Sequence, residues 1–147
     1  MTLKDLYTYV LENGGATYCP TSKSLFTPDQ GFMVSEPSSE TVVPISKLSP
    51  ALFIEVVDCL KLLQDQYVGI WIDDDKIYFD VSTHWTNLKF ALVEGMANKQ
   101  KAIWDFQQNK AIVLPSDQRS GTITQQLEYR KQVIEKMVAN YPECKWY

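Results

Sequence analysis

Residues 67–85, YVGIWIDDDKIYFDVSTHW, decide the fold, because two apolar runs flank three aspartates. Apolar residues occupy every second position on both sides of the acidic stretch, which is typical of two strands that each bury one face. Opposed residues of an antiparallel pair share a face. This requirement pairs Ile72 with Ile77 and leaves Asp74-Asp75 as a two-residue turn. The stretch is therefore predicted to form a β-hairpin whose apolar side is scaffold.

The other side of the hairpin carries the candidate binding residues, which are Tyr67, Gly69, Trp71, Tyr78, Asp80, Ser82 and His84. In this register Trp71 opposes Tyr78, and Gly69 opposes Asp80. Because glycine has no side chain, a gap walled by the Trp71 and Tyr78 rings is predicted beside the Asp80 carboxylate. Such a gap would hold a ligand or a side chain of a partner. The alternative is that both rings pack under a helix as core residues.

An enzyme that uses Asp80, Ser82 and His84 is an alternative function, because these are the residue types of a hydrolytic triad. The pattern disfavours it, since working triads assemble from separate segments with the nucleophile on a strained turn. The chain has one histidine and three cysteines without C-x-x-C spacing, which excludes the common zinc patterns. It also lacks a phosphate-binding loop and a dinucleotide glycine fingerprint. No catalytic residue, metal or cofactor is therefore predicted.

Composition limits the partners. The net charge is −4, and no stretch gathers four or more Lys and Arg, so a nucleic acid duplex is not a predicted partner. A secretory signal pattern and an apolar run of about 18 residues are both missing, so no membrane partner is predicted either. We therefore expect a cytoplasmic protein in which Cys19, Cys59 and Cys144 are free thiols, with Cys59 in the core.

The rest of the chain predicts an α+β fold. Helices are expected at 2–13, 50–64, 87–98 and 122–140, and strands at 16–19, 31–35, 41–45, 101–106 and 110–115. Thr2, Ser49 and Thr86 are the expected N-caps. The prediction is a mainly antiparallel sheet with helices packed on one face and an added C-terminal helix. Its expected organisation is an α+β body at 1–114, a linker at 115–121, and a C-terminal helix and tail at 122–147.

The C-terminal helix has an apolar stripe near heptad spacing, made of Ile123, Leu127, Ile134, Met137, Val138 and Tyr141. A short stripe of this kind permits two arrangements. In the first, the helix covers the body of its own chain. In the second, it joins subunits into a homo-oligomer.

Four motifs follow one another between residues 12 and 106: ENGGATYCP, GFMVS, YVGIWIDDDKIYFDVS and EGMANKQKAIWDF. Together they resemble a family of small proteins from bacteriophages, prophages and other mobile elements, which share GG-x-T, G-[YF]-x-VS, Y-x-G-x-W-x-D…Y-x-DVS and KAI-[YW]-D patterns. The chain departs from that family at Asp75-Lys76, where a glycine is usual, and in its helix after residue 121. The resemblance implies a phage or mobile-element origin and transfers no catalytic residue.

Small accessory proteins of that origin often act by binding, which is an analogy and not a property of the residues. We therefore expect a non-catalytic accessory protein in the host cytoplasm. Its partner would be a host protein such as a defence complex, which it would inhibit in an anti-CRISPR-like manner, or a small signalling ligand that it sequesters. A self-assembling phage structural component, built through the C-terminal helix, is a further alternative.

Overall fold

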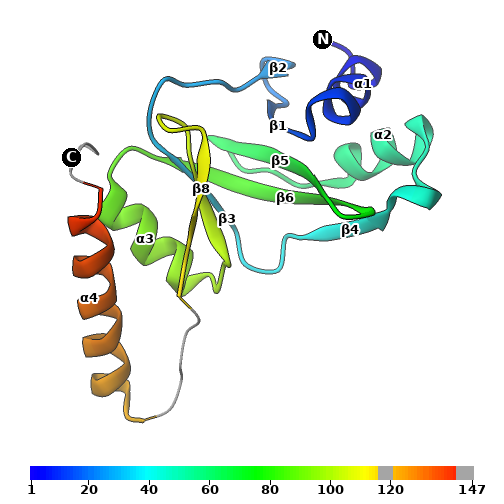
Figure 1. Cartoon of the computed structure of the whole chain (residues 1–147). Coiled ribbons are helices and arrows are strands. Elements are labelled where there is room, and N and C mark those ends of the chain that lie inside the picture. The colour runs from blue at the N-terminus through cyan, green and yellow to red at the C-terminus, as the bar shows by residue number, and fades with distance from the viewer. Residues whose placement is uncertain (116–120, 142–147) are drawn as a thin grey trace. The chain divides into compact units, whose positions relative to one another are not determined.

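The computed structural model describes residues 1–115 and 121–141, and it confirms the predicted α+β class (Figure 1). The described residues form four α-helices and eight strands, and the strand pairs described below are all antiparallel. None of these helices has the length and apolar character that crossing a membrane requires. The chain forms two compact units: unit 1 combines Met1–Thr27 with Ser38–Thr83, and unit 2 combines Pro28–Pro37 with the chain from His84 onward.

Unit 1 is built on the predicted hairpin. Its strands pair in the order β2-β1-β5-β6-β4, with bounds β1 (Gly15–Cys19), β2 (Ser24–Leu25), β4 (Thr41–Pro44), β5 (Gln66–Asp73) and β6 (Lys76–Trp85). The observed register confirms the predicted one, including Ile72 opposite Ile77 and Trp71 opposite Tyr78. The turn needs no glycine because Asp74 adopts a left-handed conformation at φ 56°, which aspartate tolerates.

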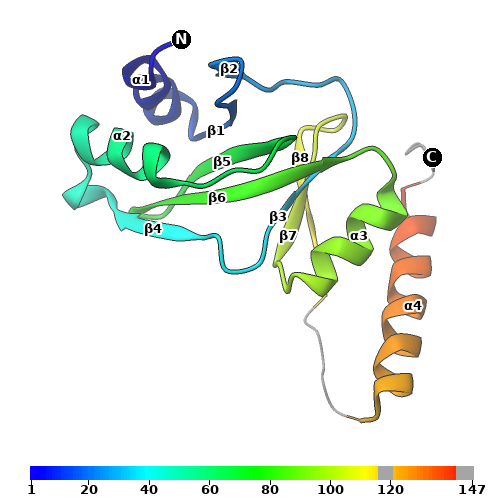
Figure 2. The ribbon, with the colours of Figure 1, turned by 180° about the vertical axis from the view of Figure 1, so that it is seen from behind.

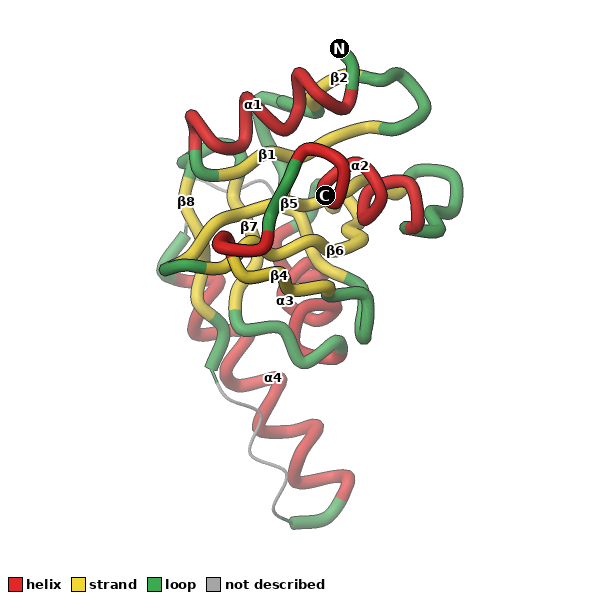
Figure 3. The backbone as a smooth tube through the Cα atoms, turned by 90° about the vertical axis from the view of Figure 1, so that its right-hand side faces the viewer, coloured by secondary structure: helices red, strands yellow, loops and turns green. Residues whose placement is uncertain are grey.

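Two helices of unit 1, α1 (Leu3–Asn13) and α2 (Pro50–Cys59), pack on the apolar face of the hairpin. Thr2 and Asp5 form a capping box at the start of α1, and Gly14 ends that helix at φ 82°. A 3-10 turn at Ile45–Lys47 leads from β4 toward α2. The core beneath the helices contains Leu6, Val10, Phe53, Val57, Val68, Ile70, Ile77 and Phe79. Figure 3 shows α1 beside β1.

The second helix is shorter than predicted, and Cys59 is not a core residue. The backbone of Leu60 is already extended, at φ −72° and ψ 128°, so α2 ends at Cys59 and not at residue 64. Cys59 is exposed because it lies two positions after the buried Val57, which places it on the opposite side of the helix. Leu63, which lies inside the helix predicted at 50–64, is 76% exposed. Spacing alone did not reveal where the helix stops.

Unit 2 contains the strands β3 (Phe32–Ser35), β7 (Ala102–Asp105) and β8 (Lys110–Val113) and the helices α3 (Leu88–Ala97) and α4 (Ile123–Ala139). Its core is made by Phe32, Val34, Leu88, Ala91, Leu92, Met96, Ile103, Ile112, Leu114 and Ile134. The cap of α3 is Asn87 and not the predicted Thr86, since the Asn87 side chain accepts a hydrogen bond from the Phe90 N–H at 3.2 Å. Residues 116–120 of the predicted linker lie outside the described residues.

Only part of the predicted stripe on α4 is covered within unit 2. Ile134 is buried, and Val133, Met137, Val138 and Tyr141 pack against the same core. Ile123 and Leu127, by contrast, are 77% and 58% exposed. Figures 1 and 2 explain the difference, because the first turns of α4 extend past the end of α3. The helix therefore covers the core of its own unit with its C-terminal half, and its role in self-association stays a prediction.

Candidate functional site

The outer face of the unit 1 sheet carries a row of residues that we call the aromatic row: Gly15, Trp71, Tyr78 and Val42. Backbone pairing places them side by side on strands β1, β5, β6 and β4. The Trp71 and Tyr78 rings stack with centroids 5.2 Å apart and planes 4° apart. Trp71 is 36% exposed and Val42 is 42% exposed. Both are apolar, so this row offers contact area that the unit itself does not bury.

Gly15 keeps the β1 side of Trp71 open. A Cβ atom on Gly15 would lie 2.9 Å from the Ile70 carbonyl oxygen, which is closer than ordinary packing allows. Glycine is thus required by the close approach of β1 and β5. As a result β1 presents no side chain directly opposite the indole, and a partner could reach that ring from the β1 side.

The gap predicted beside Asp80 is not there, because the Asp80 carboxylate itself fills the space over Gly69. A Cβ atom on Gly69 would collide with Asp80 Oδ1 and would lie 3.3 Å from Ser82 Oγ. The Ser82 hydroxyl donates a hydrogen bond of 2.5 Å to Asp80 Oδ1, and both side chains are 2% exposed. Gly69 therefore makes room for a carboxylate and not for a ligand. The predicted site divides into an exposed aromatic part and a buried polar part.

Tyr67 lies next to the buried polar part. Its ring stacks on Phe26 with centroids 4.1 Å apart and planes 14° apart, and it is half-buried. Burial raises the pKa of the Tyr67 hydroxyl, with smaller contributions from the charges of Cys19 and Asp65. The Tyr67 phenol therefore stays protonated at neutral pH, as an uncharged hydroxyl beside the β1 strand.

His84 is held by other residues of unit 2. Its Nε2 atom lies 3.1 Å from the Gln30 carbonyl oxygen, which can only accept, so Nε2 carries the proton. The imidazole meets the Phe106 ring edge-on at 5.8 Å, and a Cβ on Gly31 would overlap it. His84 thus has a packing role beside a glycine, in a place where the sequence pattern suggested an extension of the hairpin site.

These hydrogen bonds do not have the order that nucleophilic catalysis needs. A triad requires the hydroxyl to donate to an imidazole nitrogen that accepts. Here the Ser82 hydroxyl donates to a carboxylate, and Nε2 of His84 donates to a backbone carbonyl. Across 1–115 and 121–141, no three side chains of His, Cys, Asp or Glu are grouped to hold a metal ion.

The thiol of Cys19, which is not among the predicted site residues, lies at the end of β1. Hydrogen bonds from the Ser22 hydroxyl and from the Ser22 and Thr21 N–H groups lower the pKa of Cys19. Ser22 Oγ is itself 2.6 Å from Ser24 Oγ. Cys19 and Cys59 are free thiols, as predicted, while Cys144 lies outside the described residues. In the sequence, the sign of this thiol environment was a serine three residues after the cysteine, in a turn.

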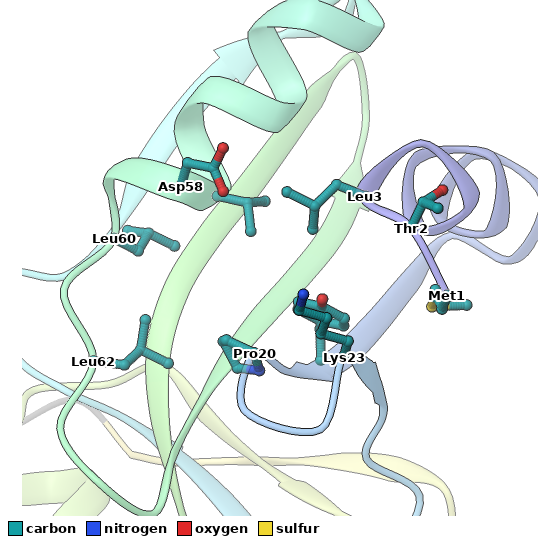
Figure 4. Close-up of a pocket in the computed structure, with 10 residues that line it drawn as sticks. Met1, Thr2, Leu3, Pro20, Lys23, Asp58, Leu60 and Leu62 are labelled. Carbon is teal, nitrogen blue, oxygen red and sulfur yellow. The ribbon is translucent and has the colours of Figure 1, made fainter.

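A pocket of about 450 Å³ opens between α1, the β1–β2 turn and the segment that follows α2. It is lined by Met1, Thr2, Leu3, Tyr18, Pro20, Lys23, Val57, Asp58, Leu60 and Leu62. Figure 4 shows that the Leu3, Leu60 and Leu62 side chains point into the same space. This pocket was not predicted, because Leu60 and Leu62 fall inside the longer helix expected at 50–64. The extended backbone after Cys59 is what turns them toward it.

No protein-family model matches the chain, and searches of curated proteins and of solved structures found no match. The resemblance to small phage and mobile-element proteins therefore stays a prediction from the motifs alone.

Exchanging Gly69 for alanine should destabilise unit 1. The new Cβ forces the Asp80 carboxylate off the Ser82 hydroxyl, and a buried polar group that loses its partner costs about 1–3 kcal/mol. Urea unfolding of Gly69→Ala measures the loss. In an Asp80→Ala background the same exchange should cost much less, because no carboxylate then occupies the space. Equal losses in both backgrounds would contradict this account.

Cys19 should react with iodoacetamide faster than Cys59 at neutral pH. Its lowered pKa means that more of the reactive thiolate is present at a given pH. A pH series followed by peptide mass spectrometry gives the midpoint for each thiol, and Ser22→Ala should move the Cys19 midpoint upward. Ser46→Ala is the matched control, which should leave it unchanged. A Cys19 midpoint that is insensitive to Ser22→Ala would show that the hydrogen bond is not the cause.

Proposed function

We propose that the protein is a non-catalytic binding protein that holds a protein partner on the aromatic row. The observation that carries this proposal is the stacked Trp71–Tyr78 pair with an indole that is 36% exposed. Tryptophan and tyrosine are enriched at the centres of protein interfaces, where they bury large apolar areas at a small entropy cost. Stacking holds the pair in one orientation before a partner arrives, which lowers the cost of ordering it.

The charge beside the aromatic row indicates what the partner presents. The exposed turn Asp73–Lys76 has three carboxylates and one ammonium, which gives 1 − 3 = −2. A cation is attracted both to this turn and to the face of an indole ring. We therefore infer that the partner places an arginine or a lysine near Trp71. Arginine fits better, because its planar guanidinium stacks on aromatic rings.

The source of the partner follows from the resemblance to small phage and mobile-element proteins. Such a protein acts inside the host cell, so a host protein, for instance a component of a defence complex, is the proposed target. Inhibition would then come from covering the basic surface of that component. The bonding of Asp80, Ser82 and His84 supports a binding role over an enzymatic one.

Truncating the aromatic row should weaken partner capture while leaving the fold intact. We expect Trp71→Ala to weaken binding about thirtyfold or more, corresponding to roughly 2 kcal/mol, the level of an interface hot spot. Lysate of a bacterial host is passed over the immobilised wild type and variants, and recovered partners are quantified by mass spectrometry and then titrated. Phe90→Ala, which removes another exposed ring, is the matched control.

Charge reversal adds a second comparison to the same experiment. Asp74→Lys should slow association and weaken its dependence on salt, since the steering charge is lost. Recovery of the same partner by Trp71→Ala as by the wild type, with both proteins folded, would refute the aromatic row as the binding surface.

A small ligand is the second candidate, favoured by the pocket of about 450 Å³ beside α1. Its volume lies in the range of ligand sites, and its walls combine leucines with Lys23 and Asp58. The pocket suits a molecule with an apolar body and a charged group.

Native mass spectrometry of the purified protein should then show the added mass of a bound ligand, which Leu62→Trp removes by filling the pocket. Leu63→Trp, at a 76% exposed neighbour, should keep it; equal retention by both variants would exclude this site.

A further inference from the structure

β8 lies at the edge of the β3-β7-β8 part of unit 2, and half of its backbone groups point away from its neighbour. Within the described residues β8 pairs only with β7, with Ile103 opposite Ile112. The Leu114 N–H donates to the Lys101 carbonyl at 2.8 Å. Hydrogen-bonded and non-hydrogen-bonded pairs alternate along an antiparallel ladder, so Ile112 also bonds to β7. Ala111 and Val113 must then direct their N–H and C=O groups to the open edge.

The side chains at this edge are apolar and exposed. Val113 is 74% exposed, and Ala111 is exposed beside its register partner Trp104, itself 37% exposed. Folded proteins usually protect such edges with proline, a bulge or inward-pointing charges. Between Lys110 and Val113 the strand has no proline, and Lys110 is its one charged residue. The edge is thus suited to pairing with another strand.

We propose that this edge joins two copies of the chain, by antiparallel pairing of β8 with β8 of a second copy. In the register that uses the outward groups, Ala111 of each copy opposes Val113 of the other, and each such pair exchanges two N–H···O bonds. Ile112 then lies on the two-fold axis opposite Ile112 of the second copy. The interface is isologous, so both edges are used and the assembly closes as a dimer.

Charge and side-chain pattern favour a second copy as the occupant and select this register. Lys110 of one copy lies opposite Leu114 of the other, so the two ammonium groups stay at opposite ends of the ladder. Parallel pairing would bring both lysines together. On the outer face, the row of Trp104 and Ala111 continues into Val113 of the second copy, which places Val113, 74% exposed in the single chain, beside Ala111. A slip of one residue would turn these side chains to the other face.

The exposed end of α4 is the competing surface within unit 2. It presents Ile123 and Leu127 but no unpaired strand backbone, because its N-terminal groups are satisfied by a capping box of Thr122 and Gln125. The β8 edge combines apolar side chains with backbone donors and acceptors. This inference does not depend on the proposed function, since the aromatic row belongs to unit 1.

The oligomeric state tests the proposal. Light scattering and native mass spectrometry of the full chain over a concentration series should show a dimer. Ala111→Pro and Val113→Asp should each yield a folded monomer with an unchanged circular dichroism spectrum, since the first removes only an outward N–H and the second changes an exposed side chain. Ile123→Asp is the matched control and should remain dimeric. A wild type that is monomeric at every concentration overturns the proposal, as does a dimer lost with Ile123→Asp and retained with Val113→Asp.

Cross-linking tests the register. Chains carrying Ala111→Cys and chains carrying Val113→Cys, both with the three native cysteines changed to serine, are oxidised separately and as a mixture. Opposed residues of a hydrogen-bonded pair have Cα atoms about 5.5 Å apart, which a disulfide can span. The mixture should therefore form covalent dimers. A single variant should not, because its cysteine lies two residues along the ladder from the same cysteine of the second copy. Equal cross-linking of the single variants and the mixture would overturn this register.

Discussion

The structure of unit 1 depends on the register of one hairpin, β5 with β6. Because side chains alternate between faces, pairing Ile72 with Ile77 commits every residue of both strands to a side. A shift by one position would expose Phe79 to water and bury Asp80 under the helices. The burial of α1 and α2 against this face, the positions of β1 and β4, and the location of the aromatic row all follow from that pairing.

Local pattern was enough to predict the helix caps Thr2 and Ser49, the strand pair of unit 2 and the register of the hairpin, because each is encoded within a few neighbouring residues. It was not enough for the end of α2. Leu60 and Leu63 continue the helical spacing, and only the path back to β5 decides that the helix stops before them. Tertiary context overrides periodicity at such a point.

The hairpin pattern predicted which residues share the outer face, but not the shape of that face. Alternation placed Trp71, Tyr78, Asp80 and Ser82 on one face, and backbone pairing agrees. Alternation does not tell how far a side chain leans, and Asp80 leans over the glycine opposite it until no gap is left. Exposure of the indole and burial of the carboxylate on the same face are therefore outcomes of side-chain packing. The thiol environment of Cys19 and the pocket by α1 likewise depend on turns whose conformation short motifs do not specify.

The division of the chain into two units also has a consequence for synthesis. The segment Pro28–Pro37 belongs to unit 2 but interrupts unit 1, so the polypeptide passes between the units three times. Neither unit can be released as a contiguous fragment. On a ribosome, unit 1 has all of its residues once Thr83 has emerged, whereas β3 must wait for α3, β7 and α4 before its core can close. Premature termination after unit 1 would leave the apolar residues of β3, Phe32 and Val34 among them, without their packing partners.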